Sequence, residues 1–296
     1  MNKKLMLIIN PAAGRGGYKV NFADAMQLLS GGGFRVDLYY TAGRGDASAF
    51  ARERGANYDI VACIGGDGTL SEVFDGLMDL RDPPPVGYIP MGTSNDVATT
   101  LGLPKNNCVE AARRILEGTA LPYDVGSFGA DGYFSYIAAF GAFTDVAYST
   151  PQDQKNALGH LAYVLQGMAK LPTITSYHTR VEYDGGVFEG DLVYGSMSNS
   201  TSVAGIVKFR ENMVSLNDGL SELVLVRTPE SLDVFADLAA SVLSQRFDSD
   251  SLVILQTKAA RFSFDRPVAW TRDGEDGGEH RELALSTCPS ALRIIR

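Results

Sequence analysis

Two short polar segments carry the residues of this chain that are best able to do chemistry. The first, IGGDGTLSE at residues 64–72, places Asp67 among three glycines directly after a short apolar run. The second, PMGTSNDVA at residues 90–98, places Asn95 and Asp96 after another apolar run. Glycine loses the most conformational entropy on ordering, so a glycine cluster needs a reason. The reason is either a tight turn or a ligand that comes close to the backbone.

Both segments contain the pattern Gly-Thr-x-x-acid, which fits a helix capping box: Thr69 with Glu72, and Thr93 with Asp96. For each residue alone, capping is the simpler interpretation. Taken together, the segments indicate two neighbouring parallel strands that end in glycine turns and open helices. Ligands of such sheets bind at the carboxyl ends of the strands. Helix N-termini at that edge favour phosphate.

Phosphate beside Asp67 and Asp96 would be repelled unless a cation lay between them. Mg²⁺ takes one or two carboxylates together with phosphate oxygens and water. We therefore interpret the two segments as a site for magnesium and the phosphates of a nucleotide. The chain contains no G-x-x-x-x-G-K-[ST] loop, and no complete G-x-G-x-x-G follows the first strand, which argues against a Walker-type ATPase and a dinucleotide redox enzyme.

The elements that must position these residues follow an alternating pattern. Over residues 1–125, apolar strand patterns at 5–9, 34–40, 60–64 and 86–89 alternate with helical ones. This rhythm predicts an α/β domain with a parallel sheet and helices on both faces. Residues 126–286 are predicted to form a mainly antiparallel β-sandwich. Its strand patterns lie at 177–183, 192–196, 222–226, 252–256, 261–264 and 282–285, with helical patterns at 154–170 and 231–245.

Composition limits the class of protein. Of 296 residues, 45% are hydrophobic and 21% charged, which is ordinary for a globular chain. The net charge of -9 argues against a nucleic-acid partner and against a polybasic membrane anchor. Three distant cysteines, Cys63, Cys108 and Cys288, show neither disulfide nor zinc spacing. The apolar run near the N-terminus is shorter than the roughly 7–15 residues of a signal peptide. We expect a cytoplasmic protein, peripheral to the membrane at most.

Together, the motifs of this chain resemble those of the diacylglycerol kinase catalytic-domain family, which includes bacterial soluble diacylglycerol kinases and sphingosine kinases. The motif GGDGT alone also occurs in NAD kinases and phosphofructokinases, but its combination with P-x-G-T-x-N-D is specific. The segments that carry the resemblance are NPAAG (10–14), GGDGTLSEVFDGL (65–77), PMGTSNDVATTLGLP (90–104), PYDVG (122–126), NALGHLAYVL (156–165), LNDGLSELVLV (216–226), DGE (273–275) and CPSALRII (288–295).

The resemblance implies an ATP-binding first domain, a second domain that completes the lipid site, and a last strand, 287–296, that returns to the first domain. It also implies a nucleotide and magnesium network at Asp67, Asp96 and Asp124. The expected phosphate site consists of Asn10, Gly66, Gly68, Thr69, Thr93 and Asn95. Where the family often has an arginine, this chain has Thr99, and Arg15 or Lys19 could supply a phosphate-facing charge instead.

Two further carboxylate segments have competing interpretations. From spacing alone, Asp273-Gly274-Glu275 is a hairpin turn. The resemblance instead assigns Glu275 as general base, with Asp273 positioning it or sharing its role. Asp218, in Asn-Asp-Gly, is either an ordinary turn residue or, through the resemblance, a ligand of a structural Mg²⁺.

The expected function is transfer of the γ-phosphate of ATP to a lipid hydroxyl, with diacylglycerol as acceptor and phosphatidic acid as product. An NAD kinase-like enzyme and a nucleotide-binding regulator without turnover are the alternatives. The lipid would be met at a membrane surface. The oligomeric state stays open, with a homodimer as one alternative.

Overall fold

The computed structural model describes residues 3–14, 19–142, 175–200, 202–203, 207–208 and 215–296. The chain forms two compact units. The first unit comprises Met1–Tyr136, Ser215–Leu220 and Thr287–Arg296, and the second comprises Ile137–Val214 and Ser221–Ser286. The helix predicted at 154–170 lies outside the described residues.

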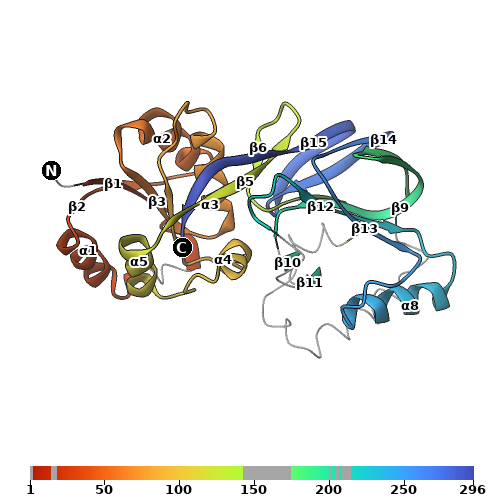
Figure 1. The fold of residues 1–296 in the computed structure, drawn as a ribbon, viewed down its shortest axis with the longest axis horizontal. Coiled ribbons are helices and arrows are strands. Elements are labelled where there is room, and N and C mark those ends of the chain that lie inside the picture. Colours follow the sequence, from red (N-terminus) through yellow and green to blue (C-terminus); the bar gives the residue numbers. More distant parts are fainter. Residues whose placement is uncertain (1–2, 15–18, 143–174, 201, 204–206, 209–214) are drawn as a thin grey trace. The chain divides into compact units, whose positions relative to one another are not determined.

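A parallel sheet forms the centre of the first unit (Figure 1). Its strands pair in the order β4, β3, β1 and β2, and every one of these pairs is parallel. The strands are β1 (Lys3–Ile9), β2 (Phe34–Tyr40), β3 (Ile60–Gly65) and β4 (Val86–Pro90). The helices are α1 (Phe22–Gly31), α2 (Asp46–Arg54), α3 (Asp67–Leu77), α4 (Asp96–Leu101) and α5 (Cys108–Glu117), with the 3-10 turn η2 (Gly55–Asn57) after α2.

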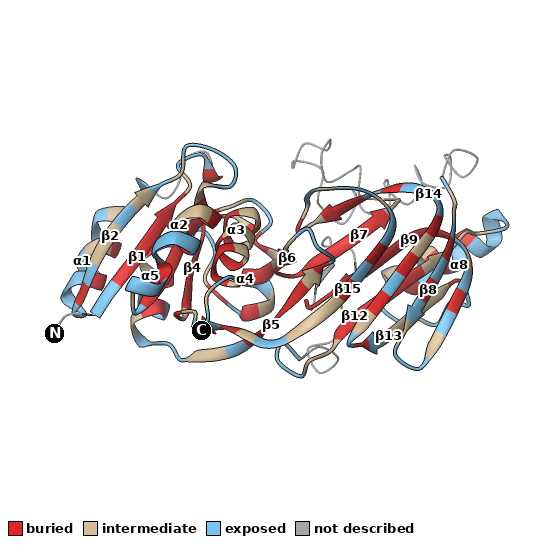
Figure 2. Cartoon of the chain, turned by 90° about the horizontal axis from the view of Figure 1, so that it is seen from above, coloured by how far each residue is buried: buried red, intermediate tan, exposed pale blue. Residues whose placement is uncertain are grey.

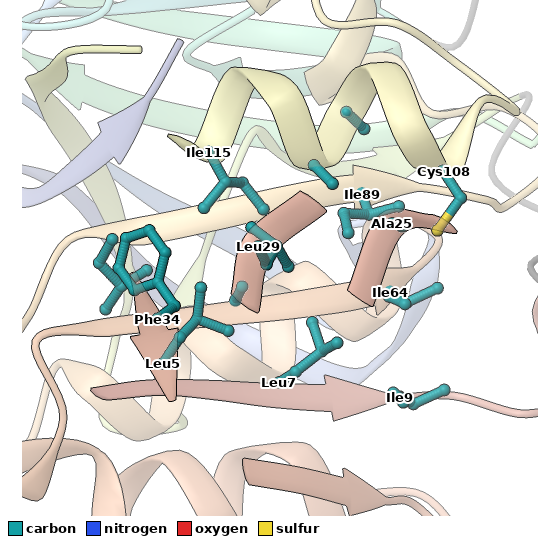
Figure 3. Close-up of a cluster of buried hydrophobic side chains, with 14 of the residues drawn as sticks. Leu5, Leu7, Ile9, Ala25, Leu29, Phe34, Ile64, Ile89, Cys108 and Ile115 are labelled. Carbon is teal, nitrogen blue, oxygen red and sulfur yellow. The ribbon is translucent and has the colours of Figure 1, made fainter. Parts of the chain in front are cut away.

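The sequence of β1 explains why helices cover this sheet on both faces. Alternate residues of a strand point to opposite faces. Leu5, Leu7 and Ile9 lie in a core cluster with Leu29 of α1 and Ile115 of α5 (Figure 3). Met6 and Ile8, which point the other way, are also fully buried. A strand apolar on both faces is typical of a covered parallel sheet.

The first unit is larger than the predicted domain of residues 1–125. It also contains residues 126–136 and 215–220. The strand β5 (Ala120–Phe128) runs past the predicted boundary and pairs with β6 (Tyr133–Phe134). The segment at 215–220 joins because the backbone N–H of Asp124 donates to Leu216 O (2.8 Å). Residues 287–296 also lie in this unit, where Ile294 pairs in parallel with Val86 of β4.

The second unit is built from antiparallel strands, which agrees with the predicted sheet-rich second half (Figure 2). The strands pair in the order β13, β12, β9, β7, β14 and β15, and β8 pairs with both β9 and β14. They are β7 (Ile137–Gly141), β8 (Tyr177–Tyr183), β9 (Gly186–Ser198), β12 (Ser221–Arg227), β13 (Leu252–Thr257), β14 (Ala259–Arg272) and the first part of β15 (Glu275–Ile295). The helix α8 (Leu232–Leu243) and the short strands β10 (Ser202–Val203) and β11 (Val207–Lys208) complete the described elements.

One feature of the second unit differs from a sandwich of two separate sheets. The long strands β9 and β14 change partners along their length, since each pairs with β8 over one part and with β7 over another. The ladder of hydrogen bonds is therefore continuous. Phe140 of β7 packs on Phe264 and Trp270 of β14, with ring centroids 4.9 Å apart in each pair. These rings form an apolar core for the unit.

Candidate active site

Three loops of the first unit meet at the carboxyl ends of β1, β3 and β4. The side-chain amide of Asn10, after β1, donates to Thr69 Oγ1 of α3 (3.1 Å). The backbone N–H groups of Met91 and Gly92, after β4, donate to Gly65 O at 2.8 and 3.1 Å. These contacts bring the three loops together, and the loops carry the residues that the resemblance assigns to one phosphate site: Asn10, Gly66, Gly68, Thr69, Thr93 and Asn95.

Close packing between these loops explains part of the glycine requirement. A Cβ atom on Gly92 would lie 2.4 Å from the Cα of Gly66. Gly14 has φ +54, and a Cβ there would lie 2.2 Å from Met91 O. The glycines are thus needed by the loops themselves. The same smallness leaves the backbone accessible to a phosphate group.

We expect Gly92→Ala to lower both stability and ATP affinity, because the new methyl group would overlap the backbone of Gly66 and displace the loop. Overpacking of this kind typically costs about 1–3 kcal/mol. Urea unfolding and ATP titration calorimetry measure the two effects. Gly43→Ala is the control, because a Cβ at Gly43 has no neighbour within 4 Å. Equal behaviour of the two variants would contradict the packing argument.

Asp67 is held by the helix that follows β4. Its side chain is 8% exposed. Oδ2 accepts a hydrogen bond from the backbone N–H of Asp96 (2.9 Å), and Oδ1 accepts one from Val97 (3.2 Å). Asp67 therefore caps α4 across the two turns. This contact links the two motifs physically and fixes the carboxylate at the predicted cation site.

The predicted capping boxes are wrong, because the N-cap residues are Gly66 for α3 and Asn95 for α4, and neither makes a side-chain cap. The helix α3 begins at Asp67, with Gly66 as N-cap and no side-chain cap, so Thr69 lies inside the helix. Glu72 instead accepts hydrogen bonds from Gly45 N (2.9 Å) and Ala47 N (3.2 Å) at the start of α2. A capping pattern in sequence does not reveal which helix start a carboxylate reaches, because that depends on how helices pack.

Asn95 shapes the turn after β4. It is 1% exposed and has a left-handed backbone, with φ 52. Its side-chain oxygen accepts from Gly92 N–H (3.0 Å), and its side-chain nitrogen donates to Gly92 O (2.9 Å). The hydroxyl of Tyr88 donates to the same side-chain oxygen (3.3 Å). Burial raises the pKa of Tyr88, and the nearby charge of Asp67 adds to this shift, so the phenol remains a donor. Thr93, in contrast, is exposed.

A lysine lies beside Thr99, the position at which the family often has an arginine, and its place there was not predicted from the sequence. Lys105 Nζ donates to Thr99 Oγ1 (2.7 Å), which places an ammonium group beside α4. The signal was the position of Lys105 soon after Gly102, the left-handed C-cap that turns the chain back. Arg15 lies outside the described residues, and Lys19 is exposed.

Asp124 is fully buried and joins three segments of the first unit. Oδ2 accepts from Gly219 N–H and Oδ1 from Ser290 N–H, both at 2.6 Å. Burial raises the pKa of this carboxyl, while the two N–H groups oppose the shift. Both oxygens are therefore engaged in structural contacts, in addition to the predicted role in the magnesium network.

We expect Asp124→Asn to destabilise the protein, because the amide nitrogen would face a backbone N–H. An unsatisfied buried donor costs about 1–3 kcal/mol. Since the folded pKa is raised, the native state binds the proton more readily than the unfolded state. Wild-type stability should fall as pH rises from the ordinary aspartate pKa, about 3.9, through the raised value. Urea unfolding at a series of pH values checks both points. If Asp124→Asn keeps the pH dependence of the wild-type unfolding free energy, that dependence does not come from Asp124.

Asp218 lies in a turn of the first unit, directly before Gly219, the residue that donates to Asp124. Asp218 is exposed, and its Oδ1 accepts from Leu220 N–H (3.0 Å), which is an Asx turn. The turn interpretation accounts for this contact. Within the described part of the chain, no group of three or more His, Cys, Asp or Glu side chains is arranged to hold a metal ion. The metal roles of Asp67, Asp96, Asp124 and Asp218 therefore remain predictions.

In the second unit, Asp273 and Gly274 form a two-residue hairpin turn between β14 and β15. Their φ values of 51 and 80 and the pairing of Arg272 with Glu275 fit a type I′ turn. Asp273 is 4% exposed. Its N–H donates to Ile137 O (2.8 Å), and its Oδ1 accepts from Ile137 N–H (3.0 Å). Glu275 is exposed. These contacts favour positioning for Asp273 over proton transfer.

Comparison with known proteins agrees with this geometry. Residues 4–128 match the diacylglycerol kinase catalytic domain. The chain is 31% identical to the diacylglycerol kinase of Bacillus subtilis (strain 168) over 93% of its length and 91% of that protein. It is 32% identical to that of Staphylococcus aureus (strain MRSA252), over 94% and 88%.

Among solved structures, a diacylglycerol kinase from Bacillus anthracis str. Sterne superposes with a TM-score of 0.77 at 24% identity, over 99% of this chain and 96% of that one. An NAD kinase from Archaeoglobus fulgidus in complex with ATP gives 0.52 at 12% identity, over 99% and 93%, so both structures show a shared fold. No helix in the described ranges has the length and apolarity needed to span a bilayer. The identity to the curated relatives over nearly the whole chain shows that this protein is a kinase of the diacylglycerol kinase family.

Proposed function

We propose that this kinase transfers the γ-phosphate of ATP to the hydroxyl of diacylglycerol and forms phosphatidic acid. The observation that carries the proposal is the meeting of three glycine loops at the ends of β1, β3 and β4, with Asp67 fixed on the N-terminus of α4. Two curated relatives with this activity in their names support the acceptor. The similarity to an NAD kinase, at 12% identity, concerns the fold alone.

The loops of the first unit would hold the nucleotide phosphates. The helix α3 starts at Asp67 directly after the glycine turn, so its N-terminal N–H groups and partial positive charge favour an anion there. Asp67 and Asp96 offer carboxylate oxygens, which are ligands of the kind that Mg²⁺ prefers. A bound Mg²⁺ would neutralise the charge between carboxylate and phosphate.

In this proposal, Glu275 takes the proton of the acceptor hydroxyl. Its carboxylate is exposed, and the type I′ turn fixes its backbone. Asp273 positions that turn through its two hydrogen bonds to Ile137. Phosphoryl transfer depends mainly on such positioning and on charge neutralisation.

Transfer from labelled ATP to a panel of purified acceptors tests the proposal. The panel contains diacylglycerol in mixed micelles, sphingosine, phosphatidylglycerol and NAD. We expect diacylglycerol to be the best acceptor. Transfer to phosphatidylglycerol or sphingosine alone would replace the substrate and keep the mechanism. Transfer to NAD without any lipid product would favour the NAD kinase alternative, and ATP binding without transfer would favour a regulator.

For Asp218 we propose a structural Mg²⁺ at the exposed turn. If this is right, Asp218→Ala lowers the melting temperature and removes part of any stabilisation by magnesium. Thermal unfolding of both proteins, with and without Mg²⁺, measures the difference. Asn217 lies in the same turn and accepts from Ser215 Oγ, so Asn217→Ala serves as a neighbouring control. If Mg²⁺ raises the melting temperature of wild type and Asp218→Ala equally, Asp218 holds no cation and serves only the Asx turn.

A further inference from the structure

A row of buried polar side chains crosses the sheet of the second unit. In the ladder, Ser198 of β9 pairs with Glu222 of β12, and Glu222 pairs with Gln256 of β13. Directly paired residues, and residues two apart on one strand, point to the same face of a sheet. Ser196 therefore shares this face, and we name Ser196, Ser198 and Glu222 the polar patch.

The polar patch is deeply buried. Ser196 and Ser198 are 0% exposed, and Glu222 is 4% exposed. One oxygen of Glu222 is held by the side-chain amide of Gln256 (3.3 Å) at the edge of the sheet. The hydroxyl of Ser198 makes no hydrogen bond to any residue that the structure describes. Buried hydroxyls normally have partners, so this one indicates a missing polar group such as a ligand or a water.

The opposite face of the same strands is apolar. Met197 of β9 lies beside Leu223 of β12 in the ladder, and both are fully buried. Leu225 continues this face and is also fully buried. The core of the unit is thus built on that side. The serines of the polar patch point away from these apolar side chains, which favours a binding role for them.

The polar patch is next to the turn of the proposed base. Ser198 pairs with Ile137 of β7, and Ile137 exchanges two hydrogen bonds with Asp273. One strand therefore separates Ser198 from Asp273, so the backbones are about 10 Å apart, which is two strand spacings. Glu275 follows Asp273 by two residues, and all of these residues belong to the second unit.

We infer that the polar patch binds the polar end of a neutral, hydroxyl-bearing glycerolipid, and that Ser198 sets the affinity for this acceptor. This inference rests on the proposed lipid kinase function and adds the residues that recognise the lipid. The Ser198 hydroxyl can donate to an ester carbonyl oxygen, and the Glu222 carboxylate can accept from a hydroxyl. Both groups suit the ester and hydroxyl oxygens of a diacylglycerol.

Ser198→Ala, which removes the hydroxyl and leaves the strand, tests this inference. Ser221→Ala is the matched control, because Ser221 is a buried serine on the neighbouring strand whose side chain points to the opposite face. Equilibrium dialysis with radiolabelled dioctanoylglycerol measures binding without turnover. We expect Ser198→Ala to weaken binding about three- to tenfold, the effect of one lost hydrogen bond. In the transfer assay, KM for the lipid should rise by a similar factor while KM for ATP stays unchanged.

The two readouts separate this inference from the proposed function. If wild type binds dioctanoylglycerol and Ser198→Ala binds it more weakly, the polar patch is supported even when no phosphate is transferred. If wild type transfers phosphate and Ser198→Ala has unchanged lipid KM and binding, the hydroxyl meets only water and the inference is overturned. Failure of wild type to bind dioctanoylglycerol also overturns it. Should Ser198→Ala fail to fold, Ser198→Thr keeps the hydroxyl, and Ser196→Ala with Ser196→Thr repeats the comparison on the same face.

Discussion

Asp67→Asn is expected to lower the rate of phosphate transfer by roughly two to three orders of magnitude, the typical effect of losing one preorganised polar group at a reacting centre. The substitution acts in two ways. It removes a negative charge from the proposed magnesium site, and it places an amide NH₂ against a backbone N–H of Asp96 or Val97. Initial rates with diacylglycerol and labelled ATP over a magnesium titration measure the effect.

Glu72→Gln separates these two effects. Glu72 is a carboxylate on the same helix, and it also accepts two backbone N–H groups at the start of another helix. Its loss should lower stability in the same manner, while the rate stays near that of wild type. If folded Asp67→Asn keeps a near-normal rate, Asp67 is a cap for α4 and nothing more. If both variants lose activity equally, distortion of the loops explains the loss.

The parallel sheet of the first unit could be predicted from sequence because its cause is local. Alternating strand and helix patterns, such as the fully apolar runs of β1 and β3, allow few topologies. The second unit was predictable only as an antiparallel, sheet-rich region. The exchange of partners along β9 and β14 depends on contacts between residues distant in sequence, such as Arg261 with Glu182 and Arg272 with Ala138. Strand patterns alone do not specify such pairings.

The candidate site shows the same division. Glycines and carboxylates after strands predicted where the site lies, because strand ends of a parallel sheet share one edge. The partners of each carboxylate could not be predicted. Asp67 reaches the start of α4, Glu72 reaches α2, and Asp124 reaches two segments far along the chain. The burial of the Ser198 hydroxyl without a partner among the described residues could not be predicted either, since a serine on a strand usually faces water.

Glu275→Gln tests the second half of the proposed chemistry, because glutamine keeps the shape of the side chain and cannot accept the acceptor proton. The loss of a general base typically lowers a rate about 10²- to 10⁴-fold. The effect should fall on kcat with diacylglycerol. ATP affinity should change little, since Glu275 lies in the second unit and the proposed phosphate loops lie in the first. Single-turnover transfer and ATP titration calorimetry measure the two quantities separately.

Glu279→Gln is the control for Glu275→Gln, as it neutralises an exposed carboxylate on the same strand, and it should leave kcat unchanged. A variant that loses ATP binding yet keeps its rate at saturating ATP would assign Glu275 to the nucleotide. A near-normal kcat in Glu275→Gln would place the base on another residue, and Asp273 would then be the next carboxylate to replace, since its contacts with Ile137 hold it in the same turn.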